Sequence, residues 1–493
     1  MARTIVPSEL LQSTNNNIKI GDTALDSVDT TSPDTAADNV AIGNAALTAN
    51  LFGNENVAIG SYALDALTTG SNNIAIGNNA GGATTTGTQN TALGSGSLNT
   101  LTTHTRNTAV GYLALAATIN DDNTAVGTQA LGNNTTGYYN VGLGYLAGGA
   151  ITTGNSNVAI GTLALDANTT ASNNTAVGHA ALTANTTGAS NVALGAYALD
   201  ANTTAANNTA IGANALSTNV TGSENTAVGE EALYLNTASN NTAVGYFALR
   251  TNSTGANNVA VGFGALDANT TAAQNTAVGV SALTTNSTGA ANTACGNDAL
   301  YGVTTGDNNV GLGKNAGQSI TTGANNIMLG RDAGITGSPG GAITTASNTI
   351  SFGDENIGTA NIQVDWTVAS DARDKTDVEP LKTGLSFINQ LEPITYRWDK
   401  RSKYSDNQNV SPDGTHKEDW LDTGFLAQDV EKLEEEYGYQ MSDKTNLTTT
   451  LSEDGKMYGL TYSKFVPSLV KAVQELSAEN KALLDRLTTL ENK

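Results

Sequence analysis

The clearest candidate for chemistry in this sequence is a serine followed five residues later by a lysine, Ser370 and Lys375. A serine hydroxyl becomes a nucleophile only when a base accepts its proton, and a lysine whose pKa is lowered by burial can act as that base. Histidine, the more usual base, occurs only as His104, His179 and His416, and no serine stands in a Gly-x-Ser-x-Gly elbow. The spacing alone fits a catalytic dyad and equally fits two unrelated polar residues.

The chain around this pair resembles the endosialidase-type intramolecular chaperone, an autoproteolytic serine peptidase domain that ends many phage tail spikes and tail fibres. The resemblance is carried by "SDARDKTDVEPL" (370–381), "LEPITYRWD" (391–399), "GFLAQDVEKL" (424–433) and "YSKFVPSLVKAVQEL" (462–476). It implies that Ser370 is the nucleophile, that Lys375 is the base, and that the cut lies between Ala369 and Ser370. Asp374 stands where many members have an apolar residue, and a carboxylate beside Lys375 favours the protonated lysine. The alternative is a chaperone that folds the protein and stays attached.

Residues 39–348 contain a tandem repeat. The pattern Asn-x-[Ala/Gly]-[Ile/Val/Leu]-Gly occurs eighteen times from Asn39 to Asn326, with fifteen intervals of 17 residues and two of 16. Two units depart from it at one position each, with Cys295 in place of the branched residue and Met328 in place of the small residue. So regular a period indicates one small unit stacked many times. Seventeen residues rich in Asn, Thr and Gly favour two short strands and two turns, which make one coil of a β-solenoid. No proline occurs between Pro33 and Pro339, which fits coils that need every backbone N–H.

The repeat positions predict how a coil packs. We expect the Asn residues to form a ladder from coil to coil. The Ile, Val or Leu three residues after each Asn, and the Leu eight residues after it, are predicted to fill a narrow core. Cys295 occupies the first of these positions, which predicts a buried small side chain. The Ala or Gly two residues after the Asn predicts a close approach, which we assign to further copies of the chain, and so thin a core favours a homotrimer.

Repeat units such as "NVAIGTLAL" (157–165) and "NTAVGYFAL" (241–249) resemble the head repeats of trimeric autotransporter adhesins, which are left-handed parallel β-rolls. The resemblance covers roughly residues 39–334 and implies a trimeric β-roll. The repeat is longer than that family's usual unit, so each coil is expected to carry a longer loop. The autotransporter's signal peptide and membrane-anchor barrel are not expected in this chain.

The composition excludes several classes of function. The 493 residues include 22 Lys and Arg against 45 Asp and Glu, a formal net charge of −23. Binding to nucleic acid or to anionic membranes requires basic clusters, so neither is expected. The sequence contains no run of 18 apolar residues, so we expect no membrane-spanning helix. A single cysteine excludes a disulfide framework or a Cys-based zinc site. The acidic residues of the repeat are scattered rather than paired, so we expect no glycosidase activity, no metal and no cofactor.

The distribution of charge gives the domain boundaries. Residues 39–348 hold 4 basic and 13 acidic residues, whereas residues 369–493 hold 16 and 23, and all three tryptophans, Trp366, Trp398 and Trp420, lie beyond residue 360. The predicted parts are an N-terminal virion-attachment segment (1–38) with the apolar stretch "IVPSELL" (5–11), a solenoid rod (39–348), a β neck (349–368), a self-cleaving chaperone domain (369–465) and a coiled-coil helix (466–493).

Two stretches near the end of the chain have a helical pattern. The coiled coil is predicted from spacings of four and three residues in Leu469, Val473, Leu476, Asn480, Leu483, Leu487 and Leu490. Val at a positions with Leu at d positions favours a dimer, against the trimer expected for the rod. The run "EKLEEEYG" (431–438) predicts the solvated end of an amphipathic helix capped by Gly438, and not a metal site.

Together these features predict a mainly β protein, with a trimeric parallel β-solenoid of about 18 coils, a small α+β chaperone domain and a coiled-coil helix. The predicted function is that of a homotrimeric phage tail fibre or host-adhesion rod in the virion tail. Its N-terminus would attach to a tail or baseplate protein, and the rod would meet a host cell-surface glycan or protein receptor. As an enzyme it would be at most a single-turnover, self-cleaving serine endopeptidase. A bacterial surface adhesin and a structural spacer that binds nothing are the competing classes.

Overall fold

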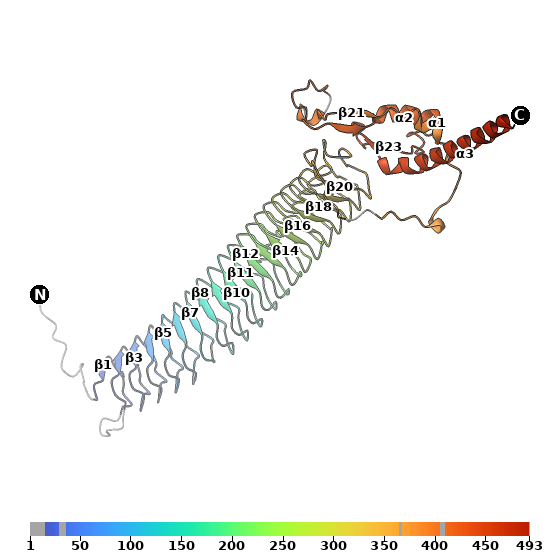
Figure 1. Cartoon of the computed structure of the whole chain (residues 1–493). Coiled ribbons are helices and arrows are strands. Elements are labelled where there is room, and N and C mark those ends of the chain that lie inside the picture. The colour runs from blue at the N-terminus through green and yellow to red at the C-terminus, as the bar shows by residue number, and fades with distance from the viewer. Residues whose placement is uncertain (1–14, 29–35, 364–366, 405–409, 493) are drawn as a thin grey trace. The chain divides into compact units, whose positions relative to one another are not determined.

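The computed structural model describes residues 15–28, 36–363, 367–404 and 410–492. The chain divides into two compact units, residues 1–292 and 293–493, and twenty short strands belong to one parallel sheet (Figure 1). A C-terminal region with a few helices and two small antiparallel sheets follows the strands. The predicted mainly β architecture, a parallel solenoid followed by a small α+β region and a terminal helix, is confirmed. The stretch 5–11 and Trp366 lie outside the described residues.

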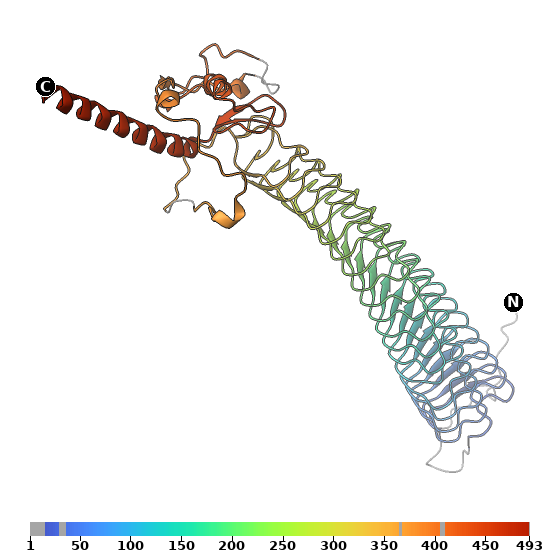
Figure 2. The ribbon, with the colours of Figure 1, turned by 90° about the vertical axis from the view of Figure 1, so that its right-hand side faces the viewer.

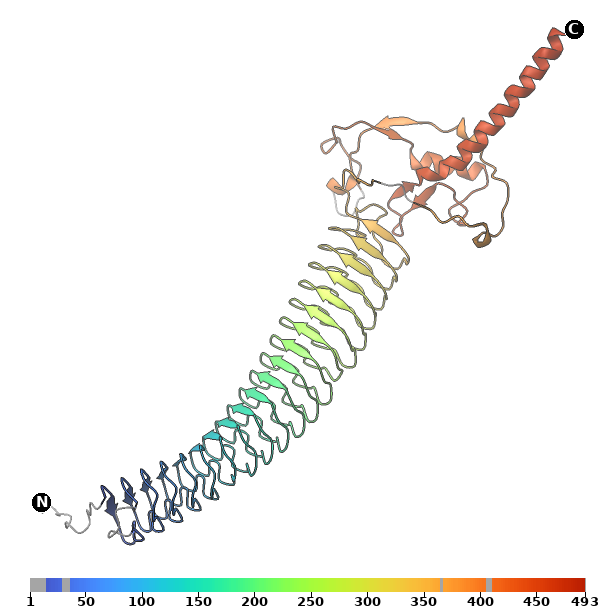
Figure 3. The same ribbon diagram turned by 60° about the horizontal axis from the view of Figure 1, so that its bottom comes forward.

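Within each unit, consecutive strands pair in parallel with a shift of one repeat, as in Thr175 opposite Val192 (Figure 2). Each strand has three residues. The first unit contains β1 (Ile18–Ile20), β2 (Val40–Ile42), β3 (Val57–Ile59), β4 (Ile74–Ile76), β5 (Thr91–Leu93), β6 (Thr108–Val110), β7 (Thr124–Val126), β8 (Val141–Leu143), β9 (Val158–Ile160), β10 (Thr175–Val177), β11 (Val192–Leu194), β12 (Thr209–Ile211), β13 (Thr226–Val228), β14 (Thr242–Val244), β15 (Val259–Val261) and β16 (Thr276–Val278). The second unit contains β17 (Thr293–Cys295), β18 (Val310–Leu312), β19 (Ile327–Leu329) and β20 (Ile350–Phe352), stacked in the same way (Figure 3). The parallel stack thus has one strand before the first repeat and one after the last.

The repeating Asn forms the predicted ladder. The backbone N–H of Asn56 donates to Oδ1 of Asn39 at 2.9 Å, and that of Asn73 donates to Oδ1 of Asn56 at 3.0 Å. The Nδ2 group of Asn56 donates to the carbonyl of Gly70 at 2.9 Å. The left-handed backbone lies at the residue before the ladder Asn, such as Glu55 with φ of 60°, and not at the Asn itself. The ladder amides therefore satisfy backbone groups that are buried between coils.

The interior of each coil is made by the small strand residue and the Leu, and not by the branched strand residue. Ala243 and Leu249 are fully buried, whereas Val244 is 37% exposed. Side chains alternate along a strand, so the residue after the Ala faces away from the interior. A Cβ added to Gly142 would lie 2.8 Å from Leu131 Cγ, so there is no room for a branched side chain at this position. The prediction that the branched residue fills the core, and that the Ala or Gly faces another copy of the chain, is wrong.

The third residues of the strands form a column that we call the outer apolar stripe. Its members are half-buried or exposed in the single chain. The stripe consists of Ile20, Ile42, Ile59, Ile76, Leu93, Val110, Val126, Leu143, Ile160, Val177, Leu194, Ile211, Val228, Val244, Val261, Val278, Cys295, Leu312, Leu329 and Phe352. Cys295 is exposed, so the prediction of a buried thiol is wrong for the same reason.

The backbone explains why Gly replaces Leu in four coils at the eighth position after the Asn. Leu47 and Leu64 have φ of 54° and 50°, and Gly81 and Gly148 have φ of 60° and 63°. A left-handed backbone strains a leucine but not a glycine. The coils with Gly therefore keep the same backbone path, and in two of them a buried isoleucine packs beside the glycine: a Cβ added to Gly148 would lie 2.9 Å from Ile151 Cδ1, and one added to Gly317 would lie 3.1 Å from Ile320 Cδ1.

The C-terminal region has a small apolar core formed by Phe387, Val430, Leu433 and Phe465. Strand β21 pairs with β22 and β23 with β24, both antiparallel. The elements are η2 (Ala372–Asp374), α1 (Leu385–Ile388), β21 (Ile394–Tyr396), η3 (Arg401–Lys403), β22 (Asp422–Gly424), α2 (Ala427–Glu436), β23 (Thr449–Leu451), β24 (Tyr458–Leu460), η4 (Tyr462–Lys464) and α3 (Phe465–Glu491). None of the helices in the described ranges has the length and apolarity that a membrane crossing requires.

Helix α2 ends as predicted, but one of its acidic residues is not solvated. Gly438 has φ of 84°, and its N–H donates to the carbonyl of Glu435 at 3.0 Å, as in a helix cap. Glu434 is only 1% exposed. Its carboxylate accepts the Thr448 N–H at 2.7 Å and the Thr449 hydroxyl at 2.6 Å. The prediction of a wholly solvated run is therefore wrong at Glu434, which ties α2 to β23.

Candidate self-cleavage site

The structure brings Ser370 and Lys375 into contact. Lys375 Nζ lies 2.7 Å from Ser370 Oγ and 3.3 Å from the Ser370 carbonyl oxygen. The residues between them form the short turn η2, and Asp371 caps its start because Oδ1 accepts the Arg373 N–H at 2.9 Å. The turn closes where the Lys375 N–H donates to the Ala372 carbonyl at 3.3 Å. One tight turn thus returns the lysine side chain to the serine.

Of the two carboxylates next to the pair in sequence, Asp371 forms an ion pair of its own. The guanidinium of Arg373 binds Asp371, with Nη2 2.6 Å from Oδ2 and Nε 3.1 Å from Oδ1. The side-chain and backbone hydrogen bonds from Arg373 lower the pKa of the Asp371 carboxyl below its ordinary value. Asp371 therefore stays ionised and bound to Arg373, while Asp374 is an exposed carboxylate next to Lys375 in sequence.

Ser370 and Lys375 are both exposed. Among the described residues, the Ser370 hydroxyl has one hydrogen-bond partner, Lys375 Nζ. A lysine acts as a base only as the neutral amine, and removal from water is what favours that form. The single chain therefore supplies contact between the predicted nucleophile and the predicted base, but not the desolvation that would activate them.

The segment after the pair is anchored to the terminal helix. The hydroxyls of Thr383 and Ser468 lie 2.7 Å apart and are buried. The backbone N–H of Leu385, at the start of α1, donates to Glu475 Oε2 at 2.7 Å. Helix α3 is thus tied directly to the segment that carries Ser370 and Lys375.

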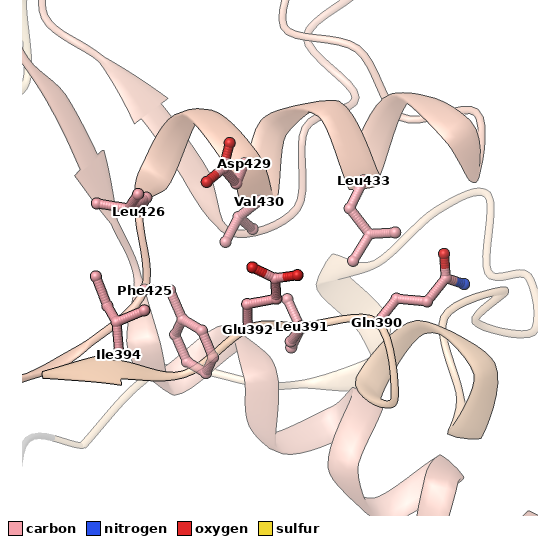
Figure 4. A pocket seen from close by; sticks show the side chains of 9 residues that line it. All are labelled: Gln390, Leu391, Glu392, Ile394, Phe425, Leu426, Asp429, Val430 and Leu433. Carbon is pink, nitrogen blue, oxygen red and sulfur yellow. The ribbon is translucent and has the colours of Figure 1, made fainter.

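The C-terminal region also has a pocket of about 310 Å³ beside α2, shown in Figure 4. Six of its nine lining residues are apolar and three are polar, two carboxylates and one amide. The lining consists of Gln390, Leu391, Glu392, Ile394, Phe425, Leu426, Asp429, Val430 and Leu433. It contains neither member of the Ser370–Lys375 pair, so this pocket is separate from the predicted chemistry. The described parts of the chain contain no group of three or more His, Cys, Asp or Glu side chains placed to hold a metal ion.

Comparison with known proteins gives one family. Residues 370–439 match Peptidase_S74, described as chaperone of endosialidase. The match begins at Ser370 and includes Lys375 and three of the four stretches that carry the resemblance, while the fourth, 462–476, lies beyond it. No curated protein and no solved structure matches the chain. The chain therefore contains a chaperone-of-endosialidase domain after a parallel β-solenoid.

Sequence reasoning missed Glu453. This residue lies between β23 and β24, and its carboxylate accepts the backbone N–H of Thr344, which is 109 positions earlier in the chain. The stretch "SEDGK" (452–456) contains an Asp-Gly pair, which is a signal for a hairpin turn. Nothing in the sequence connects that turn with the end of the repeat.

Proposed function

We propose that this chain is the subunit of a homotrimeric phage tail fibre or host-adhesion rod. Its C-terminal domain assists the folding of the trimer and is released by a cut before Ser370. The observation that carries the proposal is the order of the two parts, a parallel β-solenoid followed at residue 370 by a chaperone-of-endosialidase domain. A dedicated folding domain suits a repetitive rod, because identical repeats can pair in a wrong register.

The outer apolar stripe supports association with further copies of the chain. In β11, for example, the stripe residue Leu194 is 46% exposed, and Val192, two residues earlier on the same face of the strand, is 37% exposed. Apolar patches that extend over many residues mark interaction surfaces in soluble proteins. Three copies around a common axis can each turn this stripe inward, so that every stripe is covered. The stripe, and not the buried Ala, is the proposed interface of the trimer.

Helix α3 has a second exposed apolar surface, which also supports association with further copies of the chain. Leu476, Leu483, Leu487 and Leu490 are 46%, 54%, 54% and 67% exposed, and they follow the heptad spacing. A coiled coil with equivalent helices would bury them. Although Val at an a position favours two strands, three helices fused to a trimeric rod are brought together by the rod.

The proposed cut uses only groups of this chain and water. Lys375, as a neutral amine, accepts the proton of the Ser370 hydroxyl, and Oγ attacks the carbonyl carbon of Ala369. The C–N bond then breaks, the Ser370 nitrogen takes up a proton, and an ester joins the Ala369 carbonyl to Oγ. Water hydrolyses this ester to give a body ending at Ala369 and a fragment beginning at Ser370. The required desolvation of Lys375 is assigned to the trimer, since the single chain leaves it exposed.

The remaining partners follow from this proposal. The N-terminal segment would attach to a tail or baseplate protein of the virion, and the rod would meet a glycan or protein receptor on the host cell. Exposed aromatic rings such as Tyr246 and Phe263, which are 41% and 55% exposed, favour recognition through stacking and hydrogen bonds. The virion tail is the proposed location.

The experiment is to measure the intact mass and the native oligomer mass of the wild type, Ser370→Ala and Lys375→Ala. The wild type is expected to give fragments 1–369 and 370–493, and both variants a full-length trimer. Ser411→Ala, a change at an exposed serine of the same region, should cleave normally. A wild type that assembles but stays at full length after prolonged incubation contradicts the cleavage. A monomeric mass contradicts the fibre.

A further inference from the structure

The carboxylate of Glu453 binds the backbone of the last coil of the solenoid. Oε2 accepts the Thr344 N–H at 2.8 Å and the Ala346 N–H at 3.2 Å, and Oε1 accepts the Thr345 N–H at 2.9 Å. The Thr345 hydroxyl also donates to Oε1. Glu453 lies in the turn between β23 and β24, while the three N–H groups lie between β19 and β20. One side chain of the C-terminal region thus satisfies three consecutive backbone groups of the repeat.

In the preceding coils of the same unit, the next coil satisfies the equivalent groups. The Thr304 N–H donates to the Thr321 carbonyl at 2.9 Å, and the Thr321 N–H donates to the Thr344 carbonyl at 2.8 Å. The hydroxyls of Thr304 and Thr321 donate to the same carbonyls at 3.2 and 3.1 Å. At Thr344 the series of carbonyl acceptors ends, and the carboxylate of Glu453 takes the position of the next one.

The last coil is shaped to meet the hairpin. The Thr349 N–H donates to Asn326 Oδ1 at 2.9 Å, which is the ladder contact, but the two residues are 23 positions apart and not 17. Within the longer coil, Gly341 lies against the hairpin turn, because a Cβ added to it would lie 2.6 Å from Ser452 Cβ. Its φ of 76° also favours glycine. The close approach thus depends on a residue without a side chain.

The hairpin turn is held in a fixed shape. Ser452 Oγ accepts the N–H groups of Lys456 and Met457 at 3.2 and 2.9 Å. Nη2 of Arg401 donates to the Lys456 carbonyl at 2.6 Å, so η3 supports the turn from outside the hairpin. Lys403 Nζ contacts Asn356 Oδ1, which makes a further link to the chain that leaves β20. Glu453 is therefore presented from a braced turn rather than from a free loop.

We propose that the β23–β24 hairpin is an end cap of the solenoid, in which Glu453 stands in for the next coil and holds the last coil closed. This inference deepens the chaperone role proposed above, because it names the surface on which the domain acts, but it does not depend on cleavage. Unpaired backbone groups at the end of a solenoid can pair with another chain, and the carboxylate occupies three of these groups in the loop before β20.

The test is amide hydrogen exchange in the full chain, with Ser370→Ala as the parent so that the domain stays attached. Peptides that contain Thr344, Thr345 and Ala346 are followed by mass spectrometry. In Glu453→Ala we expect roughly tenfold or faster exchange at these groups, because bonds to a charged acceptor are lost. Glu436→Ala, a change at an exposed glutamate of α2, is the matched control and should exchange as the parent does. Unchanged exchange in Glu453→Ala overturns the cap.

Two milder variants keep the test decisive if Glu453→Ala does not fold. Glu453→Gln keeps the size of the side chain and one acceptor, and Thr345→Val removes only the hydroxyl donor. Both should accelerate exchange at the same three groups, with the larger effect in Glu453→Gln, and protection equal to the parent in both overturns the cap. The oligomer mass of the parent separates the two proposals. A monomeric parent contradicts the fibre, whereas a trimeric parent with normal exchange in the variants contradicts only the cap.

Discussion

A coil of the solenoid completes its interior and most of its backbone hydrogen bonds within one chain, whereas the C-terminal domain leaves its candidate catalytic pair and its heptad leucines exposed. Ladder residues such as Asn56 and interior residues such as Ala243 have no exposed surface. Ser370, Lys375 and Leu490 are all exposed. The coils are thus complete within one chain except at the outer apolar stripe, whereas the candidate catalytic pair and the heptad leucines stay exposed in the single chain.

This difference gives each part a role in assembly. A rod of equivalent coils has no internal signal for register or for where to stop, because every coil offers the next the same groups. The C-terminal domain differs from the coils in sequence, and it meets the rod at the last coil through Glu453. On the proposals above, the domain sets the register and the end of the rod, while the number of coils sets its length.

The largest expected effect on assembly follows from removal of the C-terminal domain. Deletion of residues 370–493 before synthesis should give misassembled or insoluble rods, because the outer apolar stripe and the open end of the last coil then have no guide. The measurement is the soluble fraction and the oligomer mass of the truncated chain. The control is the full chain synthesised with the domain, which, if it is cut before Ser370 as proposed, yields the same 1–369 body. Soluble trimers from the truncated chain would show that the rod assembles unaided.

A charge in the outer apolar stripe should separate assembly from folding. Val244→Asp places a carboxylate at the third residue of β14, where the side chain points away from the interior. We expect the coil to fold and the trimer to be lost or much weakened, because a buried unpaired charge is costly in an interface. Sedimentation reports the oligomer and circular dichroism the fold. Thr254→Asp, at an exposed loop position, should assemble normally, and an intact Val244→Asp trimer would exclude this stripe as the interface.

The neighbouring residue should show the opposite behaviour. Ala243 is fully buried inside its own coil, so Ala243→Leu overpacks the interior and should destabilise the chain by about 1–3 kcal/mol. We expect a lower unfolding temperature with the trimer still present below it. Ala243→Ser, which adds a single oxygen, should cost less. If Ala243→Leu dissociated the trimer without lowering the unfolding temperature, the small residue would face another chain after all.

Much of the rod was predictable from the sequence, because a strict period fixes the architecture of a solenoid. The Asn ladder also followed from residue type, since a buried repeated amide has few other roles. The two faces of the strand were predicted the wrong way round, however, with the branched residue inside and the small residue outside. The pattern Ala-Val is the same whichever residue faces inward. Only the opposing Leu of the preceding coil, such as Leu131 against Gly142, shows that the interior is too thin for a branched side chain.

In the C-terminal domain, short-range features were predictable and long-range contacts were not. The helix capped by Gly438 follows from local pattern. The pairing of Ser370 with Lys375 was implied by the resemblance, since the spacing alone fits two unrelated residues equally well. The burial of Glu434 and the contact of Glu453 with Thr344 join segments that have no shared pattern. Such contacts depend on how the elements pack, which a single sequence with no repeat in this region does not encode in a readable way.

The smallest predicted effect is the pH dependence of the stability that the Glu453 contact contributes. Partial burial alone would raise the pKa of Glu453, but the hydrogen bonds from Thr345, Thr344 and Ala346 lower it from 4.5 to about 2. A lowered pKa means that the contact stabilises the folded chain above pH 4.5 and that this contribution is lost as the pH falls from 4.5 towards 2.

The neighbouring charges of the turn are Asp454 and Lys456, which lie 4.0 Å apart, while the three groups contributed by the coil are uncharged. We therefore expect the difference in unfolding temperature between the Ser370→Ala parent and the same chain with Glu453→Gln to be small at neutral pH. It should shrink further between pH 4.5 and about 2, where the parent's carboxylate becomes protonated. Other carboxyl groups titrate in both chains, so their effect cancels in the difference. A difference that stays constant over this range would show that the negative charge of Glu453 does not hold the last coil.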